Sequence, residues 1–226
     1  LGASADIDGF LESYYTGRRP GGIYIPRFVN IGGSSDVKDF IRGYGFQGSA
    51  KRGPNKGNGS DQAYGPNFKK IIQTPGPWKI NLGGFGEILP YHDNRMYLDY
   101  NKKDKWGLPT VTFDAEIKEN EKLMRKHLLE QIAEMLDSAG FKNIKTRDNG
   151  YYYGAGIHEM GTARMGLDKK TSVLNKYNQI HSVKNVFVTD GSCMTSSSNV
   201  NPSLTYMAIT ARAANYAVEE LKKMNL

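Results

Sequence analysis

The hydrophobic and polar positions of the chain follow two periods. Over residues 119–139 apolar side chains recur at spacings of three and four, which predicts an amphipathic helix: Met124, Leu128, Ile132, Met135, Leu136 and Ala139. Gly140 follows directly, as is common after the end of a helix. An Ala-rich stretch predicts a second helix over 202–223. Helical spacing near the start predicts a third over 1–20, on four residues: Ile7, Phe10, Leu11 and Tyr14.

Runs of β-branched and aromatic residues predict strands between these helices. They cover residues 22–30, 36–47, 78–89, 95–100, 110–117, 143–147 and 185–189. Residues 48–66 are rich in Gly, Ser, Asn and Lys, and predict a long loop. After Gly150 the composition changes, because a stretch rich in Tyr and Gly follows at 151–156. We therefore expect an α+β fold, with an antiparallel sheet flanked by helices over 1–150 and a strand–loop–helix segment over 151–226.

Composition excludes several classes of protein. The 226 residues are 38% hydrophobic and include one cysteine, Cys193, which excludes a disordered chain and a disulfide scaffold. No apolar run approaches the roughly 20 residues of a membrane-spanning helix. The net charge of +7 comes from scattered basic pairs without a recognition motif, and this argues against nucleic-acid binding.

Two short motifs lack the sequence context that their usual functions require. Residues 43–48 read GYGFQG, a literal G-x-G-x-x-G, but the following SAKRGPNKGNGS cannot open the helix that a dinucleotide site needs. A glycine-punctuated strand and loop is the better interpretation. His158-Glu159 resembles the start of H-E-x-x-H, yet Thr162 stands where the second His is required. The four histidines lack ligand spacing, so we expect no metal site.

The last predicted helix begins in a chemically suggestive way. Asn201 and Pro202 are expected at its N-cap and first helical position, which is also how many ordinary helices begin. Ahead of it, a predicted buried strand ends in Asp190-Gly191. The positive end of a helix beside an amide donor is well suited to stabilising negative charge.

Taken in order, these segments resemble the C-terminal half of the glucose–methanol–choline (GMC) family of FAD-dependent oxidoreductases. The resemblance is carried by His158 with GTARMG, by NVFVTDGS at 185–192 and by NPSLT at 201–205. Upstream, GIYIPRF, FIRGYGFQG, GEILPYHDN and KWGLPTVTFD are similar to substrate-domain segments. The nearest members are those like bacterial sugar or gluconate dehydrogenases and pyranose oxidases. Nearly the whole chain is covered, and the order and spacing of the fragments make the match specific.

The resemblance implies a role for each of these residues. His158 would act as general base on a substrate alcohol, which the resemblance implies is a sugar or sugar acid, and Asn201 would orient the hydroxyl. The residues expected near FAD are Asp190, Gly191, Asn201, Pro202 and Ser203. Residues 1–150 would form the substrate-binding domain, and 151–226 would complete the FAD domain.

One part of the family pattern is not found in this sequence. The flavin-binding βαβ unit, with its genuine G-x-G-x-x-G, lies N-terminal in the family, whereas this chain opens on Leu1. We therefore expect a C-terminal portion that binds FAD weakly or not at all. Without that unit, residues 151–226 would rearrange or pair with another copy, as a homo-oligomer or swapped dimer. The sequence leaves bacterial cytoplasm and periplasm equally open.

A different class of function stays open beside the enzyme. The chain holds 14 Tyr, 9 Phe and 2 Trp, and such rings can stack on sugar faces. A stand-alone carbohydrate-binding or scaffold module would bind sugar without any dependence on flavin. A sugar titration of the isolated chain distinguishes the two.

Overall fold

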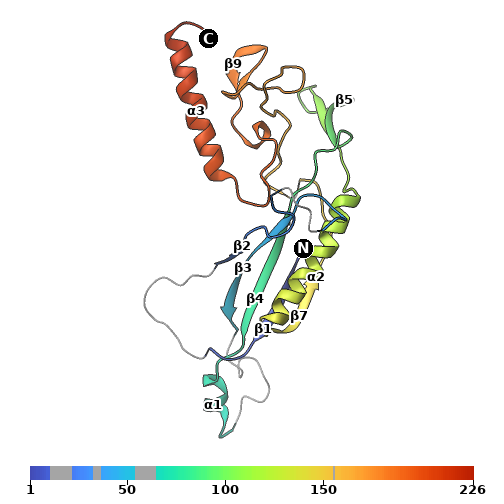
Figure 1. Ribbon diagram of the computed structural model, residues 1–226, viewed down its shortest axis with the longest axis vertical. Coiled ribbons are helices and arrows are strands. Elements are labelled where there is room, and N and C mark those ends of the chain that lie inside the picture. The colour runs from blue at the N-terminus through green and yellow to red at the C-terminus, as the bar shows by residue number, and fades with distance from the viewer. Residues whose placement is uncertain (11–21, 33–36, 54–64, 155) are drawn as a thin grey trace. The chain divides into compact units, whose positions relative to one another are not determined.

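The computed structural model describes residues 1–10, 22–32, 37–53, 65–154 and 156–226. These residues form a mixed α/β fold that divides into two compact units (Figure 1). The first unit comprises Leu1–Gly86 and Lys118–Gly150, and the second comprises Glu87–Ile117 and Tyr151–Leu226. One boundary between the units lies between Gly150 and Tyr151. The segment Glu87–Ile117, however, clusters with the second unit.

An antiparallel sheet of five strands forms the centre of the first unit. Its order is β2-β3-β4-β1-β7, and every neighbouring pair is antiparallel. The strands are β1 (Gly2–Ile7), β2 (Gly22–Ile25), β3 (Tyr44–Arg52), β4 (Trp78–Gly86) and β7 (Lys142–Arg147). The unit also contains helices α1 (Phe68–Gln73) and α2 (Glu119–Ser138).

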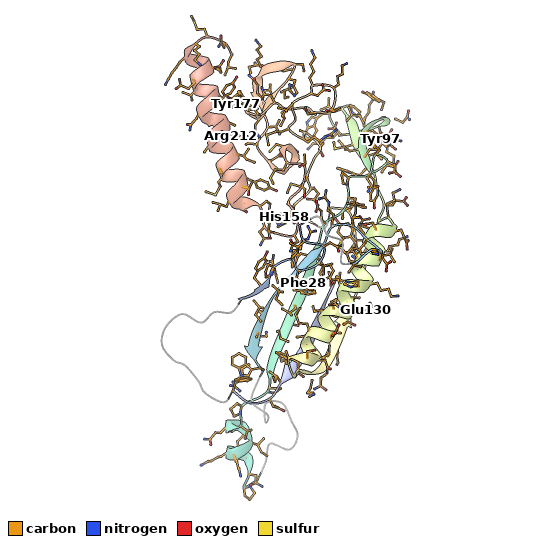
Figure 2. All side chains as sticks on the ribbon, viewed as in Figure 1. Phe28, Tyr97, Glu130, His158, Tyr177 and Arg212 are labelled. Carbon is orange, nitrogen blue, oxygen red and sulfur yellow. The ribbon has the colours of Figure 1, made fainter. Side chains whose placement is uncertain are left out.

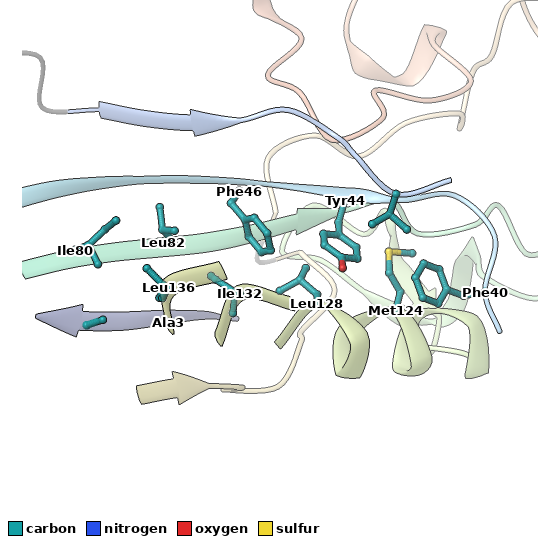
Figure 3. Close-up of a cluster of buried hydrophobic side chains, with 12 residues drawn as sticks. Ala3, Phe40, Tyr44, Phe46, Ile80, Leu82, Met124, Leu128, Ile132 and Leu136 are labelled. Atoms are coloured by element: carbon teal, nitrogen blue, oxygen red, sulfur yellow. The ribbon is translucent and has the colours of Figure 1, made fainter. Parts of the chain in front are cut away.

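Helix α2 covers one face of this sheet, as its apolar stripe predicts. Met124, Leu128, Ile132 and Leu136 are buried against strand residues that alternate inward, including Ala3, Phe46 and Leu82 (Figure 3). Gly140, at φ 84°, follows the Ala139 cap and confirms the expected end of the helix. The close fit of helix to sheet is sharpest at Gly84, where an added Cβ would lie 2.5 Å from both Leu128 methyl carbons.

Three sequence predictions in this unit were wrong. The helix expected over 1–20 is instead strand β1 at its beginning, because Ala3 and Ala5 point into the core while the backbone pairs with β4 and β7. The rest of that predicted helix, from residue 11, lies outside the described residues. The strand expected over 36–47 begins only at Tyr44, since the Asn30 side-chain amide donates to the carbonyl oxygens of Phe40 and Arg42 just before it.

The loop expected over 48–66 is also strand at its start. β3 continues to Arg52 and pairs with β4 along its whole length, so GYGFQG lies mainly within a strand, as its sequence context indicated. Residues 54–64 lie outside the described residues. The short helix α1 was not anticipated from the sequence.

The second unit is built from two small sheets and a long helix. Its elements are β5 (Arg95–Lys103), β6 (Pro109–Asp114), β8 (Gln179–Ile180), β9 (Val183–Phe187), the 3₁₀ turn η1 (Gly191–Cys193) and α3 (Ser203–Lys222). The predicted strand at 185–189 corresponds to β9, but it is exposed rather than buried, because it pairs with the two-residue β8 in a two-stranded sheet. Among the described residues no helix is long and apolar enough to cross a membrane.

Candidate active site

The second unit brings together the two residues that the sequence singled out for chemistry. His158 Nε2 lies 3.0 Å from Asn201 Oδ1, although the two residues are 43 positions apart. His158 Nδ1 lies 2.8 Å from the carbonyl oxygen of its neighbour Ile157. His158 is half-buried and Asn201 is exposed, so solvent-borne molecules can approach the pair.

Both ring nitrogens of His158 face hydrogen-bond acceptors. A backbone carbonyl only accepts hydrogen bonds, so Nδ1 must carry the hydrogen that it shares with Ile157. Nε2 faces Asn201 Oδ1, which also only accepts, so this hydrogen bond forms when Nε2 carries a hydrogen; when Nε2 has a free lone pair, the amide must rotate to present its NH2. An Asn amide offers NH2 to a neutral ring and its oxygen to a protonated one. The pair therefore suits both protonation states of the base.

The segment that follows His158 is docked by backbone hydrogen bonds onto η1. Ala163 N–H donates to the Ser192 carbonyl at 3.0 Å, and Met165 N–H donates to the Cys193 carbonyl at 2.9 Å. On the other side of His158, Tyr153 donates from its hydroxyl to the Glu116 carbonyl at 2.8 Å. His158 is thus anchored on both sides along the chain.

Asp190 and Gly191 form the turn beside this segment. The Ser192 N–H donates to Asp190 Oδ1 at 3.0 Å, and the Ser192 hydroxyl donates to the same oxygen, so Asp190 caps η1. An added Cβ on Gly191 would fall 2.8 Å from the Glu159 carbonyl oxygen. The turn therefore lies directly against the residue that follows His158, and only glycine allows that approach.

Helix α3 begins one residue later than expected. Pro202 occupies the N-cap position and its carbonyl accepts the first helical bond, from the Tyr206 N–H, so the prediction of Asn201 as N-cap was wrong. The physical reason is that Pro202, at φ −94° and ψ 5°, has not yet entered helical geometry. As a result the Asn201 side chain is not used for capping and bonds to His158. Ser203, the first helical residue, is exposed.

Side chains that sequence reasoning missed fix α3 in place. The rings of Tyr177 and Tyr216 stack with centroids 3.9 Å apart and planes 4° apart. Arg212, which Figure 2 shows on α3, donates to Oδ1 of the fully buried Asn178 at 3.1 Å. None of these residues belongs to a recognisable motif, and only the stacking of two distant rings or the burial of an amide reveals them.

Two titratable groups near the site are perturbed. Burial, and then the negative charge of Asp190, raise the pKa of Tyr206. Burial likewise raises the pKa of the Cys193 thiol, although a hydrogen bond with Asn178 acts in the opposite direction. Both groups are therefore held in their neutral forms. Within the described ranges, no cluster of three His, Cys, Asp or Glu residues is arranged to hold a metal ion.

A family model for GMC oxidoreductases matches residues 90–210, which is more than half of the chain and includes both His158 and Asn201. The chain belongs to the GMC oxidoreductase family. Members of this family are FAD-dependent and act on CH–OH groups. The match covers most of the second unit, where the site lies.

Several curated GMC relatives carry names of alcohol and sugar oxidoreductases. The chain is 32% identical to 2-methyl-1,2-propanediol dehydrogenase of Mycolicibacterium austroafricanum over 79% of its own length and 33% of that protein. It is 30% identical to the fructose dehydrogenase large subunit of Gluconobacter japonicus over 61% of the chain and 25% of the relative. It is 25% identical to the gluconate 2-dehydrogenase flavoprotein of Pantoea cypripedii over 87% of the chain and 36% of the relative. The chain thus spans about a third or less of these relatives' lengths.

Proposed function

We propose that this chain is the C-terminal portion of an FAD-dependent oxidoreductase that oxidises a CH–OH group, in a sugar, a sugar acid or a related alcohol, with His158 as the general base. The observation that carries the proposal is the His158–Asn201 pair, in which Nε2 lies 3.0 Å from the Asn201 amide oxygen in an accessible site. The printed names of the relatives, which are dehydrogenases and oxidases of alcohols and sugars, support the reaction class.

The proposed chemistry divides between the chain and the cofactor. His158 Nε2 removes the proton of the substrate hydroxyl, and the C–O bond becomes C=O as the carbon-bound hydrogen leaves with two electrons. Asn201 orients the hydroxyl, and its amide oxygen then accepts from the newly protonated ring. FAD, when bound, supplies the acceptor for that hydride.

The residues at the start of α3 fit an electron-rich cofactor edge. The first turn of this 20-residue helix contains no acidic residue, and the Pro202 N-cap supplies no side-chain acceptor to its amides. Nearby, Nδ2 of the buried Asn199 has no hydrogen-bond partner among the described residues. Unused donors of this kind favour an acceptor such as the flavin ring. Asp190 uses Oδ1 to cap η1, and its second carboxylate oxygen could contact the ribityl chain beside Gly191.

The remaining cofactor contacts must come from elsewhere in the parent enzyme. GYGFQG lies mainly in β3, paired with β4, and therefore cannot cradle a diphosphate. We place the dinucleotide-binding unit outside these 226 residues, and assign residues 1–150 to the substrate domain and 151–226 to the completion of the FAD domain. The isolated chain should then show no flavin absorbance after purification. A bound flavin band would contradict the assignment.

The base role is tested by His158→Ala in the flavin-loaded parent enzyme. Loss of a positioned base should lower kcat by about 10²–10⁴-fold while the flavin spectrum is kept. The matched control is His92→Ala, because His92 is an exposed histidine of the same unit. Its kcat should stay within about twofold of the parent, since it lies outside the proposed site. Turnover that survives His158→Ala would refute the base role.

A further inference from the structure

Three segments of the second unit converge at Gly191. A Cβ added there would lie 2.8 Å from the Glu159 carbonyl oxygen, 2.8 Å from the Tyr206 hydroxyl and 3.4 Å from Met160 Sδ. The first and third atoms belong to the two residues that follow His158, and the second belongs to the beginning of α3. Gly191 thus leaves just enough room for the His158 segment and α3 to touch each other.

The direct contact between those two segments is made by the Tyr206 hydroxyl, which donates to Met160 Sδ at 3.7 Å. Tyr206 is also the residue whose N–H bonds to the Pro202 carbonyl at 3.0 Å. Its backbone therefore holds the residue next to Asn201, while its side chain holds the second residue after His158. Together with the His158–Asn201 bond, these links close a ring of contacts around the proposed base.

We propose that Tyr206 is a positioning residue, which sets the separation of His158 and Asn201 by tying α3 to Met160. The inference rests on the proposed function, because it assigns catalysis to that pair. Tyr206 acts through its neighbours and does not touch the reacting atoms. The hydroxyl is the operative group, since the ring alone would pack against Gly191 without forming a hydrogen bond.

The surroundings of Tyr206 keep this hydroxyl in its donating form. It is half-buried, and the carboxylates of Asp190 and Glu159 lie close enough to oppose its ionisation. A thioether sulfur is a weak but adaptable acceptor, which suits a contact that sets position rather than overall stability. Replacement of Met160 by Leu conserves volume and removes the acceptor.

The test compares Tyr206→Phe, Met160→Leu and the double variant in the flavin-loaded parent enzyme. Displacement of the base from its partner should lower kcat about tenfold in each single variant, with KM within about twofold. Because both substitutions break the same contact, the double variant should be no slower than the slower single variant. The matched control is Tyr216→Phe on the same helix, which keeps the ring stacked on Tyr177 and should leave kcat unchanged.

Each outcome decides the matter. The proposal is overturned if Tyr206→Phe changes only KM or leaves kcat within about twofold of the parent, or if the two single losses multiply in the double variant. If Tyr206→Phe does not fold, Met160→Leu alone serves as the test, and a kcat equal to that of the parent enzyme overturns the proposal. His158→Ala is measured alongside. If that variant is inactive while Tyr206→Phe is unaffected, only the positioning role fails. If it is active, the base role fails and the positioning role fails with it.

Discussion

The packing of Leu128 over Gly84 makes a quantitative prediction about the stability of the first unit. Leu128 is 1% exposed, and a Cβ on Gly84 would lie 2.5 Å from its two methyl carbons and 2.9 Å from its Cγ. Carbon atoms normally pack at about 3.5–4.0 Å, so Gly84→Ala forces Leu128 to move by about 1 Å inside a filled core. Such overpacking should cost about 1–3 kcal/mol of unfolding free energy.

Leu128→Ala alone should cost more unfolding free energy than Gly84→Ala alone. The two substitutions together should cost less than the sum of the single losses. Leu128→Ala removes a buried side chain and leaves a cavity, at a cost of about 2–5 kcal/mol. In the double variant, the methyl group of the introduced alanine enters part of that cavity. The combined loss should then fall short of the sum of the single losses by about 1–2 kcal/mol.

Urea denaturation of the 226-residue chain measures these values through the fluorescence of Trp78 in β4. A Trp106→Phe background leaves Trp78 as the single tryptophan of the chain, so the signal reports the first unit. Gly83→Ala is the matched control, because its Cβ would meet Phe85 at an ordinary 3.5 Å. It should change stability by less than about 0.5 kcal/mol. Additive losses in the double variant would show that Leu128 does not fill the space above Gly84.

Two further predictions concern single contacts. Burial pushes the pKa of Asp148 upward, but hydrogen bonds from the Gly150 N–H and the Arg125 guanidinium outweigh it and hold that pKa below its usual value. The stabilisation of the folded state is therefore present above the unfolded pKa of about 3.9 and is lost as pH falls through the folded pKa. Asp148→Asn should then lower the free energy of unfolding by about 0.5–1 kcal/mol near neutrality and leave it unchanged in acid. Urea titrations at each pH measure this difference. Arg212→Met should cost about 1–3 kcal/mol in thermal unfolding, because it leaves the buried Asn178 oxygen without its donor; an unchanged midpoint would contradict this.

The parts of the fold that the sequence predicted are those whose signal is local. Helix α2 was found because its apolar positions share one face and a glycine ends it. Strand β1 was misread because Ala3 and Ala5 carry little hydrophobic signal, and their burial arises from pairing with strands far along the chain. The delayed start of β3 depends on a single amide, that of Asn30, which no periodicity reveals.

The candidate site shows the same division. His158 and Asn201 were predicted because each lies in a recognisable fragment, and the structure adds the hydrogen bond between them. Tyr206 and Arg212 escaped notice, since an aromatic or basic residue in an Ala-rich helix is unremarkable until its long-range partner is known. Gly191 was expected near a cofactor, whereas its contacts also reveal a crowded junction within the protein.

The place of β1 within its sheet has a consequence for the order of events during synthesis. Ser4 pairs with Asn81 on one side and with Lys145 on the other, so β1 is an interior strand whose two partners both come much later in the sequence. Contacts this distant along the chain close slowly and only after all their strands exist. While the ribosome is still short of β7, one edge of β1 presents unpaired backbone groups to other chains. Faster elongation through this region, or a chaperone that shields the edge, should therefore raise the yield of folded protein more than it would for a helical domain of the same size.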